Sequence, residues 1–144
     1  MPVEGLEILL RDEHSKTNTR KIAIQVLENS ISIKTVFDVI KKNEKPFSQR
    51  AAWILSTLVE IKPHFLNGQY NVLLQLVDQK YHDAVLRSSL KVLSTMKIRD
   101  KDMSELFDKS ISLIKNKNTA VAIKLWVTTT MFLLKERILQ NSLL

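Results

Sequence analysis

The sequence predicts an all-α protein, an α-α superhelix of about four helical hairpins. A short phrase recurs along it, as Leu55-Ser56-Thr57-Leu58, as Leu93-Ser94-Thr95-Met96 and, more loosely, as Thr128-Thr129-Thr130-Met131. Leu93 follows Leu55 by 38 residues and Thr128 follows Leu93 by 35, which is the spacing of stacked helical hairpins. The 144 residues include only two Gly and three Pro, too few turn residues for an all-β chain.

Apolar residues recur at helical intervals and predict eight helices in four antiparallel pairs. In each pair, the first set of apolar residues defines the first helix and the second set defines the second helix. The first pair has Val3, Leu6 and Leu10, then Ile22, Ala23, Val26 and Leu27, and the second pair has Ile33, Val36, Phe37 and Ile40, then Ala51, Ile54, Leu55 and Leu58. The third pair has Val72, Leu73, Leu76 and Val77, then Leu86, Leu90, Leu93 and Met96, and the fourth pair has Met103, Leu106, Phe107, Ile111 and Ile114, then a last helix. This last helix runs from about Thr119 into the 130s.

Residues that begin or end helices agree with these pairs. Ser32 stands before the helix that starts at Ile33, where its side-chain oxygen can accept a hydrogen bond from a free backbone N–H. Pro63 ends the fourth helix because the residue before a proline is disfavoured in the α region, whereas Pro46 is tolerated at a helix start. No low-complexity run or linker interrupts the chain, so we expect residues 1–144 to form a single domain.

The composition excludes several kinds of site. Without Cys, the chain forms no disulfide, no thiolate zinc site and no cysteine nucleophile. Acidic residues near the N-terminus, with no long apolar segment after them, argue against a signal peptide. The most apolar stretch, residues 119–134, contains Lys124 and is shorter than the ~20 residues of a membrane span. We therefore expect a cytoplasmic protein without membrane contact.

The net charge of +7 is concentrated in the second half of the chain. Residues 61–144 carry 13 basic and 7 acidic side chains, whereas residues 1–60 carry 9 and 8. A basic half suggests an acidic partner, nucleic acid among them. Lysines that keep a small helical protein soluble explain the same excess, and we favour that interpretation.

The segment His-Asp-Ala-Val-Leu-Arg-Ser-Ser-Leu at residues 82–90 resembles the turn and second helix of a HEAT repeat, which carries an Asp, a Val and a basic residue there. Related segments begin at Asn18, Ser48 and Asn118. Residues 50–56 followed by residues 60–63 also resemble a family of small bacterial HEAT-like proteins of unknown role. The resemblance implies an α-solenoid whose second helices line a concave, partner-binding surface.

Arg50 and Arg87 are candidate residues of that surface. Each follows a short polar residue at the start of a second helix, Ser48 and Asp83, and Asn18 and Arg20 repeat the arrangement in the first hairpin. Such a row would face a ligand. Alternatively, the short polar residue caps its helix and the Arg pairs with it or with a neighbouring turn. We favour this second interpretation, a ladder that joins the repeats.

Lysines also mark the predicted turns inside the hairpins. They are Lys41, Lys42, Lys45, Lys80, Lys115 and Lys117. In a solenoid these turns fall along one edge, so this basic edge is the best candidate for contact with nucleic-acid phosphate or an acidic protein. Lysines at helix C-termini also complement the helix macrodipole, and that generic role is the favoured alternative.

The aromatic residues and histidines give weaker signals. Trp53 and Trp126 lie on the second helices of the second and fourth pairs, where they would stack on a base or grip a partner, although core packing is the more common role of Trp. His14, His64 and His82 fall in predicted turns without the i+3 or i+4 partner of a helical metal site. We therefore expect solvated histidines and no metal.

Carboxylates are placed poorly for catalysis. The predicted second helices carry them only near their ends, at Glu28, Glu60 and Glu136. Acid–base catalysis needs a positioned carboxylate, His or equivalent group, and the chain has no Gly-rich phosphate loop or nucleophile elbow. We therefore expect no enzymatic activity and no cofactor.

Together, these observations favour a non-enzymatic protein-binding module that acts through the solenoid surface. The alternative is nucleic-acid binding, similar to the HEAT-like alkylpurine DNA glycosylases, which use a concave cleft with aromatic residues and a catalytic Asp. The second helices here lack that Asp, so the resemblance does not extend to glycosylase activity.

The last helix is a candidate association surface, because apolar residues occupy more than one of its faces. Trp126, Phe132 and Leu133 are its most prominent members. A second copy of the chain, another partner, or the tail 138–144 folded back would cover this surface.

Overall fold

The computed structural model describes residues 2–98 and 100–143, and the side chains of residues 2–98, 102–133, 135 and 136. These ranges contain eight α-helices and no strand. The helices are α1 (Val3–Asp12), α2 (Lys16–Leu27), α3 (Ile33–Lys41), α4 (Phe47–Ile61), α5 (Tyr70–Gln75), α6 (Asp83–Thr95), α7 (Asp100–Lys115) and α8 (Val121–Leu143), with a 3-10 turn η1 (Asn67–Gln69) before α5. The predicted all-α fold is confirmed.

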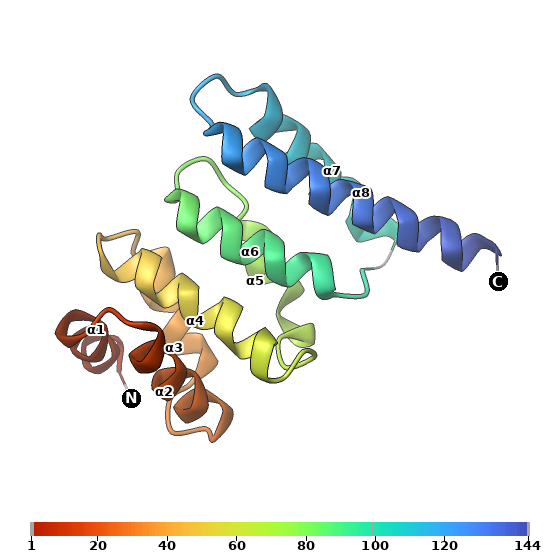
Figure 1. Cartoon of the computed structure of the whole chain (residues 1–144). Helices are drawn as coiled ribbons and strands as arrows, with labels where there is room; N and C mark the ends of the chain where they lie inside the picture. The colour runs from red at the N-terminus through yellow and green to blue at the C-terminus, as the bar shows by residue number, and fades with distance from the viewer. Residues whose placement is uncertain (1, 99, 144) are drawn as a thin grey trace.

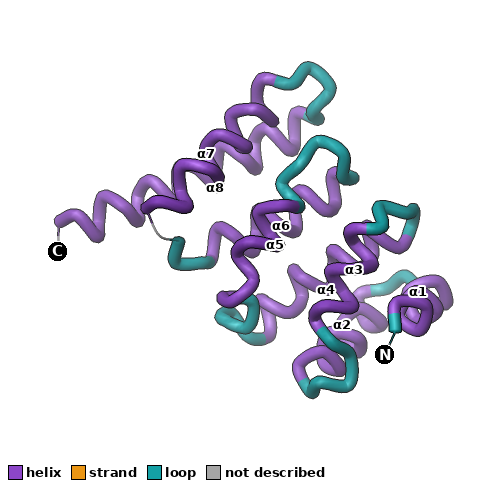
Figure 2. Tube along the Cα trace, turned by 180° about the vertical axis from the view of Figure 1, so that it is seen from behind, coloured by secondary structure: helices purple, strands orange, loops and turns teal. Residues whose placement is uncertain are grey.

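The helices form a stack of four hairpins, α1–α2, α3–α4, α5–α6 and α7–α8 (Figure 1). Their second helices make one layer, in which α4 contacts α2 and α6, and α6 contacts α8. We call the exposed surface of this layer the inner face. The turns inside the last three hairpins lie along one edge of the stack, and the connections between hairpins lie along the opposite edge (Figure 2).

Side chains before the helices decide where two of them begin. Ser32 Oγ accepts a hydrogen bond of 3.2 Å from the backbone N–H of Lys34, so the predicted cap of α3 is present. At α6 the cap is His82, whose Nδ1 accepts from the backbone N–H of Ala84 at 3.0 Å. The expected cap from Asp83 is wrong, because Asp83 is already the first residue of the helix.

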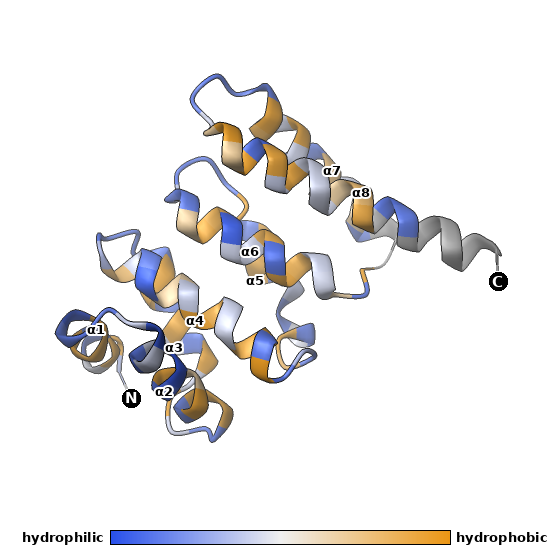
Figure 3. Cartoon of the chain, in the orientation of Figure 1, coloured by the Kyte–Doolittle hydropathy of each residue, from blue (hydrophilic) through white to orange (hydrophobic). Residues whose placement is uncertain are grey.

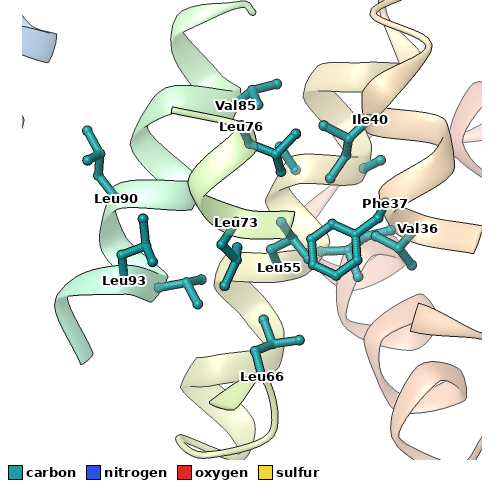
Figure 4. Packing of buried hydrophobic residues seen from close by; sticks show 14 of the residues in the cluster. Val36, Phe37, Ile40, Leu55, Leu66, Leu73, Leu76, Val85, Leu90 and Leu93 are labelled. Carbon is teal, nitrogen blue, oxygen red and sulfur yellow. The ribbon is translucent and has the colours of Figure 1, made fainter. Parts of the chain in front are cut away.

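A continuous hydrophobic core runs between the two layers. In its centre, Val36 and Phe37 of α3 point toward Leu55 of α4 (Figure 4). Leu55 and Leu93, which hold equivalent places in the recurring phrase, are fully buried. Equivalent leucines in neighbouring second helices therefore belong to one core.

The threonines of the recurring phrase have a structural role. Each donates its hydroxyl to a backbone carbonyl of its own helix: Thr57 to Trp53 at 3.0 Å, Thr95 to Val92 at 2.7 Å and Thr130 to Trp126 at 2.8 Å. A hydroxyl that is satisfied within its helix leaves no polar atom unpaired against the neighbouring helix. Thr57 and Thr130 are buried and permit close helix packing, whereas Thr95 is exposed.

Hydrogen bonds between hairpins have nearly the same span as the sequence repeat. The donors and acceptors are separated by 31 to 40 residues in the pairs Lys91–Glu60, Ser56–Ser88, Tyr70–Asp102, Lys42–Glu7, Lys109–Leu74, Asn43–Lys80, Arg50–Leu10 and Thr119–Gln79. Each of these bonds joins one hairpin to an adjacent hairpin. The recurrence seen in the sequence is therefore also the period of the contacts.

The last helix is apolar on two sides, as predicted. Ile123 and Val127 are buried, whereas Leu125 is 65% exposed and Phe132 is 61% exposed. Hydrophobic residues recur along the visible side of α8 (Figure 3). The alternative in which the tail folds back is wrong, because α8 continues without interruption to Leu143.

Candidate functional site

The inner face contains a cavity of about 570 Å³, which we call the inner cavity. Its walls come from the α1–α2 turn, the α3–α4 turn, α4, α6 and α8. The lining residues are His14, Pro46, Gln49, Arg50, Trp53, Ser56, Ala84, Arg87, Ser88, Lys91 and Trp126. A single cavity that touches all four hairpins shows that the inner face is hollowed, and its size lies within the usual range for ligand sites.

Helical spacing explains which side chains of α4 and α6 reach the inner cavity. Gln49, Trp53 and Ser56 follow one another at intervals of four and three residues on α4. Ala84, Ser88 and Lys91 do the same on α6. Residues at these intervals share one face of a helix, so two parallel stripes of side chains make the floor of the cavity.

The floor joins the two helices by a direct hydrogen bond. Ser56 Oγ donates to Ser88 Oγ across 2.9 Å, and both residues are buried. Lys91 Nζ forms an ion pair with Glu60 of α4 at the end of the same stripes. These contacts hold the cavity walls of α4 and α6 together.

Both tryptophans line the inner cavity. Trp53 is half-buried and Trp126 is 38% exposed. The core role favoured for Trp126 is therefore wrong. His14 packs edge-on against Trp53, with 5.3 Å between the ring centroids and 61° between the planes. His14 is exposed, as expected, and it also contributes to the wall of the inner cavity.

Arg50 has two environments. Its Nη1 donates to the backbone carbonyl of Leu10 at the end of α1, across 2.8 Å. This bond joins the first two hairpins, as a ladder would. The same side chain lines the inner cavity. Since a guanidinium carries five N–H donors, the bond to Leu10 leaves others for a ligand.

Arg87 lines the inner cavity and is exposed. The expected ion pair with Asp83 is not formed, and Arg87 makes no ion pair with any other described residue. Arg50, Arg87 and Lys91 give the cavity three cations, and none of its described lining residues is Asp or Glu. The inner cavity is therefore a cationic and aromatic environment.

The sequence was also compared with protein families, curated proteins and solved structures. The family model of the HEAT repeat domain matches residues 6–139. The chain belongs to this family. HEAT repeat domains are generally non-catalytic scaffolds that mediate protein interactions. No curated protein and no solved structure gives a significant match.

The predicted basic edge of this HEAT repeat domain lies on the turns that Figure 2 shows along one side of the stack. Lys41, Lys45, Lys115 and Lys117 are exposed. Lys42 instead pairs with Glu7 of α1 at 2.7 Å and lies 3.6 Å from Glu44. The hydrogen bond that Lys42 donates to Glu7 is the main reason that the pKa of Lys42 is raised above its ordinary value of 10.5.

The remaining lysine of the basic edge, Lys80, lies over the ring of Tyr81, 5.2 Å from its centroid. Lys45 and Lys80 line a smaller cavity of about 270 Å³ that shares Gln49 with the inner cavity. The structure therefore places the basic edge beside the inner cavity, a proximity that the sequence did not indicate.

Sequence reasoning missed Gln49, Lys91 and His14 as parts of a site. The signal for Gln49 and Lys91 was their position on the polar stripe of each second helix. His14 carried no such signal, because its contact with Trp53 joins a turn to a helix in the next hairpin. Gln49 Oε1 is buried and accepts no hydrogen bond from any described residue.

Within the described residues, no group of three or more His, Cys, Asp or Glu side chains is arranged to hold a metal ion. No described helix is both long enough and apolar enough to cross a membrane.

Proposed function

We propose that this HEAT repeat domain is a non-enzymatic scaffold that binds a partner protein across its inner face. The observation that carries the proposal is the inner cavity, since side chains from all four hairpins converge on it. Family membership supports it, because HEAT repeat domains generally mediate protein interactions. A stacked solenoid offers such a continuous surface without a separate binding domain.

The residue types in the inner cavity also support a protein partner. Arg50, Arg87, Trp53 and Trp126 belong to the residue types that dominate binding energy in protein interfaces. Trp126 exposes an aromatic ring that a partner would bury. Arg87 has no competing ion pair with a described residue, so a partner would not have to displace one.

The non-enzymatic part of the proposal rests on the carboxylates near the inner cavity. Among the described residues, Glu60 is the carboxylate that forms an ion pair with a lining residue, Lys91. A carboxylate oxygen that is already bound to a lysine ammonium is not free to accept a proton from a ligand in the cavity. The lining therefore suits binding better than proton transfer.

The test uses tagged full-length protein incubated with extract of the source cell, followed by mass spectrometry. Arg87→Glu reverses one cation of the inner cavity, and Arg11→Glu is the matched control, because Arg11 lies on α1 outside the cavity. A partner that binds the inner face is recovered with the wild type and Arg11→Glu and lost with Arg87→Glu. Recovery of the same proteins by all three would contradict the proposal.

A photo-crosslinking amino acid at Ala84 gives an independent readout, since Ala84 lines the inner cavity. The control carries the same amino acid at Lys34, an exposed residue of α3 in the other layer. The recovered partner should crosslink through position 84 and not through position 34.

Nucleic-acid binding is the second candidate, and the presence of two tryptophans beside arginines in one cavity favours it. Bases stack on aromatic rings, and cations follow the phosphate backbone. A gel shift with duplex and single-stranded DNA at low and moderate salt tests it. Phosphate-driven binding should fall steeply as salt rises, and no shift at low salt would reject this candidate.

A further inference from the structure

We infer that the inner cavity recognises an acidic peptide segment in which a carboxylate neighbours an aromatic side chain. The inference rests on the proposed function and names the chemistry of its partner. Three features carry it: a concentrated positive charge, two aromatic residues that line the same cavity and a buried acceptor that lacks a donor. Each feature corresponds to one part of such a peptide.

The positive charge selects a carboxylate. Arg50 and Arg87 line the cavity, and no described lining residue is acidic. Arg50 is the fourth residue of α4 and Arg87 is the fifth residue of α6, so both lie near a helix N-terminus, where the macrodipole adds partial positive charge. A guanidinium and a carboxylate match in geometry and form strong charge-assisted hydrogen bonds.

The aromatic walls select a flat apolar side chain next to that carboxylate. Trp53 and Trp126 come from α4 and α8 and line the same cavity as the arginines. His14 holds the ring of Trp53 by an edge-on contact. A phenyl ring placed between these walls would bury Trp126, which is 38% exposed in the free protein, and aromatic pairs add stabilisation beyond their buried area.

The third feature is Gln49, which selects an N–H donor. Its Oε1 atom is buried and has no hydrogen-bond partner among the described residues, and a buried acceptor without a donor is unfavourable. Gln49 lines both the inner cavity and the smaller cavity beside it. A peptide backbone that passes from one cavity to the other brings N–H groups to Gln49, and Oε1 accepts one of them when the side-chain amide turns toward the peptide.

A peptide fits these features better than a nucleic-acid strand. Of the three cations in the cavity, Lys91 is already paired with Glu60, and Arg50 already donates to Leu10. Nucleic-acid binding needs a row of free cations that follows many phosphates, whereas a single carboxylate needs one site.

The experiment uses intrinsic fluorescence, because both tryptophans of the chain line the inner cavity. The probe is the peptide acetyl-Asp-Phe-Asp-Phe-Glu-amide, and its matched control is acetyl-Asn-Phe-Asn-Phe-Gln-amide. We expect a saturable fluorescence change with the acidic peptide and not with the neutral one. The variants Trp53→Phe and Trp126→Phe assign the change, and each remaining tryptophan should report it.

Variants then place the peptide in the cavity. Arg87→Ala should weaken binding about tenfold or more, as expected for the loss of one charge-assisted hydrogen bond. Arg11→Ala should leave binding unchanged. Equal thermal melting of both variants, followed by circular dichroism, shows that the difference does not come from unfolding.

Three results would overturn the inference: no saturable change with the acidic peptide, equal binding of both peptides, or binding that Arg87→Ala does not weaken. Tighter binding of an oligothymidylate than of the acidic peptide at moderate salt would also overturn it and assign the cavity to nucleic acid. If a partner is recovered in an Arg87-dependent way while the acidic peptide fails, only the ligand class is wrong and the proposed function stands.

Discussion

Ser56 of α4 donates a hydrogen bond of 2.9 Å to Ser88 of α6, and this pair of buried hydroxyls forms the floor of the inner cavity. The bond connects positions 32 residues apart in neighbouring hairpins. It therefore links the packing of the solenoid to the shape of its candidate site.

The first prediction concerns this bond. Ser88→Ala removes the acceptor of Ser56 and should lower the free energy of unfolding by about 1–3 kcal/mol, the usual cost of an unsatisfied buried polar group. The double variant Ser56→Ala/Ser88→Ala should lose less than the sum of the two single variants, because no hydroxyl is left unpaired. Urea unfolding measures each value, and Ser104→Ala on the exposed side of α7 is the control. Strict additivity would show that the two serines do not interact.

The second prediction concerns the core. Leu55→Ala and Leu93→Ala should each lower the free energy of unfolding by about 2–5 kcal/mol, because both leucines are fully buried and each change leaves a cavity. Thr129→Ala on the exposed side of α8 serves as the surface control. A loss below about 1 kcal/mol at both leucines, the level of a typical surface substitution, would contradict the packing described above.

The third prediction is a pH dependence at Lys42. Its pKa is raised above 10.5, chiefly by the hydrogen bond with Glu7. A raised pKa in the folded state means that the pair stabilises the protein at pH values below the unfolded pKa of about 10.4, and that this contribution is lost as the pH rises through the folded pKa. Lys42→Met should therefore be less stable than the wild type at pH 7, and the difference should shrink above the folded pKa.

The control for Lys42 is Lys41→Met, since Lys41 is exposed and has no ion pair with a described residue. Urea unfolding at pH 7 and at about pH 11, just above the ordinary lysine pKa, compares the variants. A difference between Lys42→Met and the wild type that stays constant over this range would exclude the ion pair as its cause.

The fourth prediction concerns association through α8. Trp126, Phe132 and Leu133 are 38%, 61% and 44% exposed, and an exposed apolar patch of this kind usually marks an interface. We predict that the protein self-associates with a dissociation constant of tens of micromolar. This constant corresponds to about 5 to 7 kcal/mol of binding free energy. Size exclusion with light scattering should show that Phe132→Ser favours the monomer and that the nearby Thr129→Ser does not. A wild-type monomer throughout would leave a different partner as the remaining occupant of this surface.

The fold could be predicted from the sequence because its signals are local. Apolar residues at helical intervals, few Gly and Pro, and Ser32 before Ile33 each act within a few residues. The recurring phrase indicated the repeat, since its leucines, Leu55 and Leu93, are buried at equivalent places in successive hairpins.

The site could be predicted only in part. Arg50, Arg87 and the two tryptophans were candidates, but nothing local indicates that they share a cavity. The contact of His14 with Trp53 joins residues of different hairpins, and Arg87 lines the cavity instead of pairing with Asp83. Such features depend on the rotation and stacking of whole helices, which a single sequence does not specify.

The common span of the bonds between hairpins has a consequence for how the chain can change in length. Since these bonds span 31 to 40 residues, each hairpin is fastened to its immediate neighbours. A complete hairpin can then be inserted or removed as a module while the registers on either side keep their partners, in the manner of a nearest-neighbour array. The width of the cavity, and with it the length of segment that it accommodates, is therefore a quantity that evolution or design can adjust one module at a time.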